Sequence, residues 1–316
     1  RFSHTLFALP FALLAALMAW HIRWPLADWA EVVGEQMGHQ AYYVFPFLFD
    51  WNELIGLLLC MVAGRSAAMA FNRLADRKFD TLNPRTADRH LPTRILSVRS
   101  VAIFSVGSSI AFVAGTLLFL PNPLPLTFAP WILMFLLGYS FAKRFTALSH
   151  FWLGTALGLA PVSAWIAIRG GAVIHDFHDI MPAIILGASI MFWVAGFDII
   201  YSCQDVEFDR LQGLRSIPAR YGVKAALAIA AVCHAGMVIL LAIIPLVYPL
   251  MIGWIWWAGV AGIACLLIYE HRLVAPDDLT RVNLAFFNVN GVISVGLLII
   301  GTAAMYFYTI PPTSAG

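Results

Sequence analysis

Long runs of apolar residues, separated by shorter polar connections, dominate this chain. Nine runs approach or reach the length of about 20 residues that an α-helix needs to cross the hydrocarbon core of a bilayer. They cover residues 4–23, 53–76, 97–119, 126–142, 150–168, 182–203, 224–246, 250–270 and 284–308. The pattern predicts an all-α integral membrane protein whose single domain, residues 1–316, is a bundle of nine transmembrane helices.

Composition places the chain outside the soluble class. Hydrophobic residues make up 61% of the sequence and charged residues 11%, whereas soluble domains contain about 25% charged residues. The formal net charge is only +2, and no basic stretch is interleaved with aromatic residues as in a nucleic-acid-binding face. The four cysteines are isolated from one another and have the spacing of neither a zinc site nor a disulfide framework. We therefore expect the chain to lie in membrane lipid, and we do not expect it to bind nucleic acid.

The first apolar run follows Arg1 and could represent a secretory signal peptide. No small-x-small cleavage site follows it, and eight further apolar runs come after it. We therefore expect this run to be the first transmembrane helix.

Lysine and arginine collect in alternate connections. The connections after the second, fourth, sixth and eighth runs contain Arg77, Lys78, Arg85, Arg89, Arg94, Lys143, Arg144, Arg210, Arg215, Arg220, Arg272 and Arg281. The other connections contain only Arg23 and Arg169. Because Lys and Arg accumulate on the cytoplasmic side of a membrane, the N-terminus and the even-numbered connections are predicted to be cytoplasmic. An odd number of spans then places the C-terminus outside.

The connection over residues 24–51 is long and rich in aromatic residues, with scattered acids. This composition predicts an interfacial helix at the outer headgroups. A partner-binding surface or a lid is the alternative function for the same segment.

Two sets of polar residues lie at the predicted cytoplasmic ends of the second and sixth runs. The first set is Asn72, Asp76 and Asp80; the second is Asp198, Asp205 and Asp209. Spacings of four and seven residues place each set on one face of a helix. Charges inside or beside a membrane span are costly and usually mark a functional site that faces the bundle interior. The two sets therefore predict a paired site at one end of the bundle.

Carboxylates without neighbouring His or Cys suit Mg²⁺, which uses one or two carboxylates together with water and phosphate oxygens. Basic residues follow both sets, namely Arg85, Arg89, Lys143, Arg144, Arg215 and Arg220. The positive-inside rule alone would explain these basic residues but not the acids. The acids alone could line an ion pathway. Acids with arginine and lysine directly beyond them indicate a metal-bridged diphosphate clamp.

Arg65 lies seven residues before Asn72, on the same helix face and well inside the second run. An arginine at this depth needs a partner. That partner is either a carboxylate on a bound substrate or an acid on another helix.

Three ordered motifs make the chain resemble the UbiA superfamily of intramembrane prenyltransferases. Asn72-Arg-Leu-Ala-Asp76-Arg-Lys-Phe-Asp80, followed by Asn83-Pro-Arg-Thr, resembles the first aspartate-rich motif of the family. Asp198-Ile-Ile-Tyr-Ser-Cys-Gln-Asp205-Val-Glu-Phe-Asp209 resembles the second, and Tyr139-Ser-Phe-Ala-Lys143-Arg144 resembles the short basic motif between them. The resemblance covers the chain except residues 24–51, which look like an insertion relative to the family.

The resemblance implies a nine-helix bundle with a central cavity that is capped on the cytoplasmic side of a bacterial inner membrane. It implies that Asn72, Asp76 and Asp80 hold one Mg²⁺ and that Asp205 and Asp209 hold a second, with a diphosphate bridging the two ions. In this assignment Arg85, Arg89, Lys143, Arg144 and Arg215 contact the diphosphate, and Tyr139 lines the site. Asp198 would lie deeper, near the reacting centre, where it would orient or deprotonate the acceptor or have a structural or metal-supporting role. Arg65 would recognise the acceptor.

The implied reaction transfers a polyprenyl group from a prenyl diphosphate to a ring carbon of a hydroxylated aromatic acid in quinone biosynthesis. Local strings such as Asn83-Pro-Arg-Thr86 and Ser216-Ile-Pro-Ala-Arg-Tyr-Gly222 resemble the 4-hydroxybenzoate polyprenyltransferase-like branch. Some members of that branch act in the futalosine route to menaquinone, so we favour 1,4-dihydroxy-6-naphthoate over 4-hydroxybenzoate as the acceptor. The alternatives are a haem or chlorophyllide acceptor, a cation transporter and a non-catalytic quinone-binding scaffold.

Overall fold

The computed structural model describes residues 8–22 and 50–307, and every regular element in these ranges is a helix. Eight helices are long and apolar enough to cross a membrane. They belong to α3 (Trp51–Leu82), α4 (Val98–Gly115) with η2 (Thr116–Phe119), α5 (Leu124–Phe145), α6 (Ser149–His175), α7 (Met181–Ser202), α10 (Val223–Val247), α11 (Trp254–Arg272) and α13 (Asn290–Tyr306). The predicted all-α membrane bundle is confirmed.

The first predicted span contains α1 (Leu9–His21), whose 13 residues are too few to cross the hydrocarbon core alone. The count of nine spans therefore stays a prediction. The predicted interfacial helix over residues 24–51 falls almost wholly outside the described residues. α3 begins at its end, where the Asp50 side chain accepts a hydrogen bond of 2.7 Å from the backbone N–H of Asn52.

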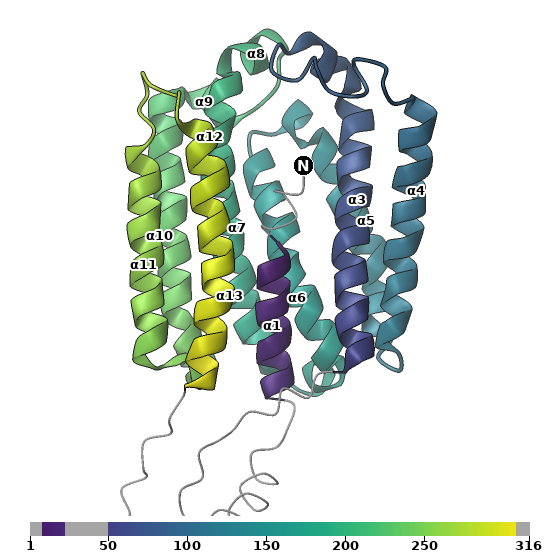
Figure 1. The fold of residues 1–316 in the computed structure, drawn as a ribbon, viewed down its shortest axis with the longest axis vertical. Helices are drawn as coiled ribbons and strands as arrows, with labels where there is room; N and C mark the ends of the chain where they lie inside the picture. The colour runs from purple at the N-terminus through teal and green to yellow at the C-terminus, as the bar shows by residue number, and fades with distance from the viewer. Residues whose placement is uncertain (1–7, 23–49, 308–316) are drawn as a thin grey trace, which may run out of the picture.

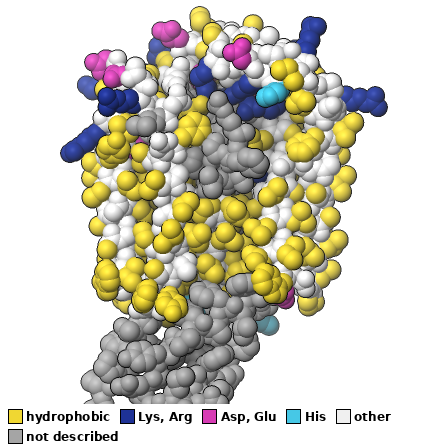
Figure 2. Space-filling model, in the orientation of Figure 1, with side chains coloured by type: hydrophobic (Ala, Val, Ile, Leu, Met, Phe, Trp, Pro, Cys, Tyr) yellow, Lys and Arg dark blue, Asp and Glu magenta, His cyan; other side chains and the backbone are white. Residues whose placement is uncertain are grey.

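The helices run side by side, with the short elements η4 (Cys203–Asp205), α8 (Val206–Leu211), α9 (Ile217–Tyr221) and α12 (Val282–Leu284) gathered toward one end (Figure 1). The side of the bundle is covered mainly by hydrophobic side chains, and the Lys, Arg, Asp and Glu side chains of this face concentrate at that same end (Figure 2). We call it the charged end. In the most apolar 18-residue stretch of each span, 67% of the residues are buried in the span that contains α7. The corresponding share is 17% for α4 and 11% for α5. α7 is thus the central helix, and α4 and α5 form a lipid-facing side.

α6 and α7 approach each other closely along a seam of small residues. Gly154 and Gly158 of α6 face the backbone carbonyl oxygens of Met191 and Gly187 of α7, and a Cβ atom at either glycine would overlap those oxygens. The spacing of four residues between the glycines is the small-xxx-small pattern that lets membrane helices pack backbone to backbone. The seam fixes the distance between α6 and α7, both of which reach the charged end.

A second group of contacts holds the opposite end together. The Arg169 guanidinium pairs with Asp179 and donates a 3.2 Å hydrogen bond to the carbonyl oxygen of Ile22, directly after α1. Asp179 also accepts a 2.9 Å hydrogen bond from the indole N–H of Trp165. These bonds satisfy a carbonyl at the end of α1 that has no partner within its own helix. They attach α1 to α6, and through η3 (Phe177–Ile180) to the start of α7.

Candidate active site

A cavity of about 660 Å³ lies between α3, α5, α6 and α7, beneath the connection over residues 83–97. Its wall is polar at the charged end and apolar farther in, where Leu57, Phe119, Phe128 and Ile132 line it. Of the site residues predicted from the sequence, all but Arg215 line this cavity; they are Arg65, Asn72, Asp76, Asp80, Arg85, Arg89, Tyr139, Lys143, Arg144, Asp198, Asp205 and Asp209. The fold therefore brings together residues that are up to 144 positions apart (209 − 65).

The first carboxylate set forms one stripe on the last three turns of α3. The Asn72 amide donates a 2.8 Å hydrogen bond to Asp76 Oδ2, and Asp80 Oδ1 accepts a 2.6 Å hydrogen bond from Arg89. Arg144, in the last turn of α5, lies 3.2 Å from Asp76 Oδ1. Burial raises the pKa of the Asp76 carboxyl, and the Arg144 hydrogen bond opposes this shift. Each acid of this stripe is already paired with a basic residue of the site.

Local sequence explains how the connection after α3 returns to the cavity. Pro84 disfavours helical conformation at Asn83, so α3 ends there. The Asn83 side chain accepts a 3.0 Å hydrogen bond from the backbone N–H of Arg85, forming an Asx turn. The Thr86 hydroxyl donates a 3.0 Å hydrogen bond to the carbonyl oxygen of Asp80. This tight turn directs Arg85 toward α7.

The second carboxylate set, Asp198, Asp205 and Asp209, is divided between α7 and the short elements that follow it. α7 ends at Ser202 and gives way to the 3₁₀ turn η4 and the short helix α8, so Asp205 and Asp209 do not continue the α-helical face of Asp198. All three still line the cavity. The three carboxylates thus face one cavity, as the spacing predicts, although a 3₁₀ turn separates α7 from α8 between Ser202 and Val206.

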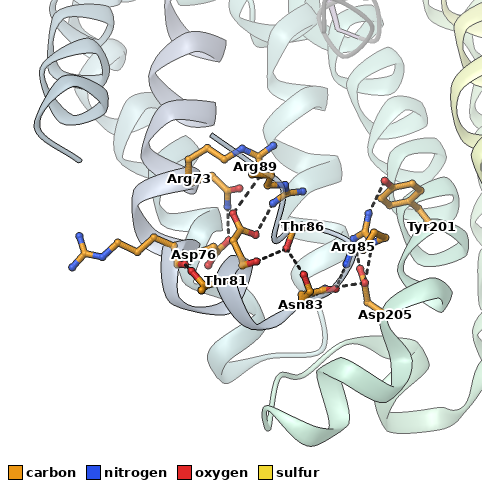
Figure 3. A network of polar contacts seen from close by, with 12 residues as sticks. Arg73, Asp76, Thr81, Asn83, Arg85, Thr86, Arg89, Tyr201 and Asp205 are labelled. Atoms are coloured by element: carbon orange, nitrogen blue, oxygen red, sulfur yellow. Dashed lines mark hydrogen bonds and ion pairs between the residues drawn. The ribbon is translucent and has the colours of Figure 1, made fainter. Parts of the chain in front are cut away.

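Asp205 is buried and accepts hydrogen bonds from Asn83 (3.1 Å) and from Arg85 Nε (2.9 Å) on Oδ1, while Arg85 Nη2 pairs with Oδ2 (Figure 3). The same guanidinium donates a 2.8 Å hydrogen bond to the hydroxyl of Tyr201. Lys143 Nζ lies 3.8 Å from Oδ2 of Asp209, which is only 2% exposed. The bidentate Arg85–Asp205 pair joins the first connection to the second carboxylate set.

The residues present fit Mg²⁺. The Oδ2 atoms of Asp80 and Asp209 are buried and have no hydrogen-bond partner in the described chain. No three His, Cys, Asp or Glu side chains converge on one point within residues 8–22 and 50–307. Mg²⁺ does not need such a cage, because it binds one or two carboxylates and completes its octahedron with water and phosphate oxygens. Asn72, Asp76 and Asp80 on one side, and Asp205 and Asp209 on the other, would hold it.

Arg215 is placed outside the cavity lining. Its backbone N–H donates a 2.6 Å hydrogen bond to the carbonyl oxygen of Lys143, and its guanidinium donates a 2.8 Å hydrogen bond to the carbonyl oxygen of Phe145. These carbonyls belong to the last turn of α5, where a cation is favourable. Arg215 therefore supports the end of the helix that carries Lys143 and Arg144, and its predicted contact with diphosphate stays a prediction.

We expect Arg89→Ala to weaken binding of magnesium diphosphate by about 10- to 100-fold, because a hydrogen bond to a charged group contributes about 1.5–3 kcal/mol. Arg215→Ala should weaken it by less than about fivefold, because this side chain contacts helix carbonyls. Calorimetric titration of the purified variants with inorganic diphosphate at fixed Mg²⁺ measures both. An Arg215→Ala loss as large as that of Arg89→Ala would move Arg215 into the diphosphate site.

Arg65 lies on α3 about two turns deeper than Asn72 and lines the cavity. Its Nε is buried and has no hydrogen-bond partner, and no acid among the described residues forms an ion pair with it. Two partners were considered for Arg65. In the described chain no acid on another helix pairs with it, which leaves the carboxylate of a bound substrate.

Sequence reasoning missed His150, Asn83, Arg73 and Tyr201. His150 lies in the first turn of α6, and its Nδ1 is 2.7 Å from Asp198 Oδ2. Arg73 lines the cavity on α3, with Nη1 3.8 Å from Asp80 Oδ2. Asn83 was visible in a motif, but its bond to Asp205 spans 122 positions, and no pattern along the chain signals such a pair.

Known proteins resemble this chain in sequence and fold. Residues 37–292 match the model of the UbiA prenyltransferase family. A 4-hydroxybenzoate octaprenyltransferase from Burkholderia mallei is 30% identical over 245 residues, which cover 77% of this chain and 79% of that protein. The apo structure of a UbiA homologue from Aeropyrum pernix K1 superposes with a TM-score of 0.74 at 30% identity, over 96% of this chain and 98% of that one. A UbiA homologue from Archaeoglobus fulgidus, solved with DMAPP and Mg²⁺, has the same fold, with a TM-score of 0.66 at 19% identity and 96% of each chain covered.

Proposed function

The chain belongs to the UbiA prenyltransferase family and is an aromatic prenyltransferase of the membrane, and we propose that it transfers a polyprenyl group to a ring carbon of a small hydroxylated aromatic acid. The observation that carries this proposal is the division of one cavity into a charged end and an apolar remainder. A polyprenyl diphosphate has the same division, with an anionic head and a long hydrocarbon tail.

Arg65 supports an acidic acceptor. From Asn72 to Arg65 the rise along α3 is about 10 Å at 1.5 Å per residue. An aromatic acid whose carboxylate pairs with Arg65 would therefore place its ring between that arginine and the carboxylate sets. Because a buried guanidinium is costly without a partner, a carboxylate on the acceptor is the natural complement of Arg65. Both 4-hydroxybenzoate and 1,4-dihydroxy-6-naphthoate satisfy this requirement, and the relative named above acts on the first.

The mechanism begins with charge neutralisation at the leaving group. Arg85, Arg89 and Lys143 now lie against Asp205, Asp80 and Asp209, so each can turn from a carboxylate to a phosphate oxygen without leaving the site. Mg²⁺ held by the two carboxylate sets would supply Lewis-acid neutralisation of the diphosphate. Once turned to the phosphate oxygens, the basic side chains stabilise the charge that develops on the departing oxygen as the allylic C–O bond breaks.

The inner part of the cavity protects the allylic cation. Its apolar wall excludes water, which would convert the cation to an alcohol. The rings of Tyr139 and Phe286 line the cavity, and an aromatic face can stabilise a cation by about 0.5–2 kcal/mol. The ring carbon of the acceptor then forms the new C–C bond, and a base accepts the ring proton. Asp198 lines the cavity and is the candidate for this base.

The same wall disfavours the cation-transporter alternative. A transport pathway needs polar groups across the bilayer, but beyond Arg65 the lining from α3 and α5 consists of Leu57, Phe128 and Ile132 with other apolar side chains.

The charged end concentrates the Lys and Arg of the described chain, so we place it on the cytoplasmic side of a bacterial inner membrane. Prenyl diphosphates would then enter from the cytoplasmic leaflet.

Product formation by the purified protein tests the function. A long-chain prenyl diphosphate and Mg²⁺ are supplied with 4-hydroxybenzoate or with 1,4-dihydroxy-6-naphthoate, in separate reactions. A prenylated product from one acid establishes the acceptor. Bound diphosphate without product from either acid would reject the acceptor class, and failure to bind prenyl diphosphate would reject the proposed reaction.

In the same assay we expect Arg65→Leu to raise KM for the acceptor acid by about 10- to 100-fold, the value of one charge-assisted pair. KM for the prenyl diphosphate should stay within about twofold of the wild type, because Arg65 lies deeper than the carboxylate sets. Arg65→Lys keeps the charge and should recover part of the loss. An equal rise in both KM values would show that Arg65 supports the cavity as a whole and does not recognise the acceptor.

A further inference from the structure

His150 is a fully buried histidine whose two ring nitrogens both have partners. Its Nδ1 lies 2.7 Å from Asp198 Oδ2, and its Nε2 lies 3.3 Å from the backbone nitrogen of Ile217. The side chain is 0% exposed, whereas that of Asp198 is 16% exposed and lines the cavity. His150 thus lies behind Asp198, on the side away from the substrates.

The contact with Ile217 determines the protonation of the ring. A backbone N–H can only donate, so Nε2 of His150 must accept and cannot carry a proton. The neutral imidazole then carries its proton on Nδ1, where it points at the Asp198 carboxylate. An imidazolium would place an Nε2–H against the Ile217 N–H. The three groups therefore form a chain with one direction, from the Ile217 amide through His150 to Asp198.

The surrounding fold holds each member of this chain in place. Ile217 is the first residue of α9, and its amide is one of the N–H groups that a helix start leaves without an internal partner. His150 precedes Gly154 and Gly158 at spacings of four, so it lies on the face of α6 that carries the α6–α7 seam. Asp198 lies on α7 beyond Gly187 and Met191, on the other side of that seam. The seam therefore fixes the distance between the two backbones that carry His150 and Asp198.

We infer that His150 is a positioning residue that holds Oδ2 of Asp198 and leaves Oδ1 directed at the acceptor ring, where it takes up the ring proton. The inference rests on the proposed function. In the step, the allylic C–O bond breaks with its electron pair going to the diphosphate oxygen, and the ring carbon forms the C–C bond to the allylic carbon. The ring C–H electrons return to the aromatic system as the proton passes to Asp198.

Two conservative variants separate this role from a purely structural one. In His150→Asn the side-chain amide can donate to Asp198 from the position of Nδ1, but it does not reach Ile217. In His150→Gln the longer side chain reaches the position of Nε2 and can accept from Ile217, but it leaves Asp198 without its donor. If His150 positions Asp198, asparagine should keep kcat within about fivefold of the wild type, and glutamine and phenylalanine should lower it by about 100-fold, the lower range for proton-transfer groups. The reverse order would mean that His150 only caps α9, and would overturn the inference.

A double variant tests whether His150 acts through Asp198. Residues that act as a unit have non-additive effects, so His150→Phe combined with Asp198→Ala should be no slower than Asp198→Ala alone. A double variant that is slower by the product of the two single effects would show independent roles.

In every variant, affinity for magnesium diphosphate should stay within about twofold of the wild type. His234→Phe is the matched control, because His234 is also buried but its partner, His271 at 3.0 Å, does not line the cavity as Asp198 does; this variant should keep kcat.

Nitrogen-15 NMR of histidine-labelled protein gives a readout independent of activity. Subtraction of the His150→Asn spectrum identifies the His150 signals, which should show a protonated Nδ1 and an unprotonated Nε2. A protonated Nε2 would overturn the inference even in an active enzyme. If the wild type formed no product from either acid, the proposed function would fail, and the NMR result alone would decide whether the Ile217–His150–Asp198 chain exists as described.

Discussion

Asp76→Ala is expected to lower the rate of product formation by about 10³-fold at saturating substrates. Asp76 is the middle member of the α3 stripe, where it accepts a hydrogen bond from Asn72 and pairs with Arg144. Its removal takes away a carboxylate from one Mg²⁺ site and leaves the diphosphate less neutralised as it departs. Loss of one group that stabilises developing charge typically costs about 10²–10³ in kcat, and loss of metal affinity adds to this.

Initial rates over a Mg²⁺ titration measure the effect, since a weakened site should also need more Mg²⁺ for half-maximal rate. Asp76→Asn keeps the shape of the side chain and should be nearly as slow, because the charge is what the cation requires. Asp88→Ala is the matched control, an exposed acid in the following connection that does not line the cavity. EDTA should abolish the wild-type rate. An Asp76→Ala enzyme within about tenfold of the wild type would exclude Asp76 from the metal site.

Gly158→Val is expected to prevent stable packing of the bundle, with a loss of more than about 3 kcal/mol in the free energy of unfolding. A Cβ at this position meets the backbone carbonyl of Gly187, which cannot rotate away as a side chain could. The helices would have to separate along the seam, and the contacts around α7, the most buried span, would be lost with it. Thermal unfolding and elution behaviour in detergent measure the change.

Gly262→Val provides the control for the generic effect of valine in a helix. Gly262 lies within α11, and a Cβ added there has nothing within 4 Å. Its unfolding midpoint should fall little, since a methyl-bearing side chain at this exposed position faces lipid. If the two variants unfolded at the same temperature, close packing of α6 on α7 would not limit the stability of the bundle.

The sequence was sufficient to predict the helices and the clustering of charge. Hydropathy runs are a direct consequence of the bilayer, and eight of the nine coincide with long helices. Residues at spacing four, such as Asn72, Asp76 and Asp80, share a face of any α-helix. What the spacing could not predict is where a helix stops being an α-helix. The 3₁₀ turn at Cys203–Asp205 redirects the chain between Asp198 and Asp209, although no proline or glycine lies between them.

Partners across helices were beyond sequence reasoning for a different reason. Arg85 was predicted to contact diphosphate, and in the structure it contacts Asp205, 120 positions away. Arg215 has the same charge and lies in an equally basic motif, but it contacts the end of α5. His150 carries no charge in its neutral form and stands at the start of an apolar run, where a buried structural histidine is the ordinary interpretation. Its role depends on the approach of α6 to α7, which only the packing of the glycines determines.

The contrast between the seam and the lipid-facing helices has a consequence for engineering the enzyme. The deep wall of the cavity is built partly from Phe112 of α4 and from Phe128 and Ile132 of α5, two helices that bury little of their surface. Substitutions at these three positions would reshape the inner part of the cavity, the proposed space for the prenyl tail, without altering the α6–α7 seam or the charged end. A combinatorial library that varies them, with α6 and α7 held constant, is therefore the economical route to variants that accept shorter or longer prenyl donors.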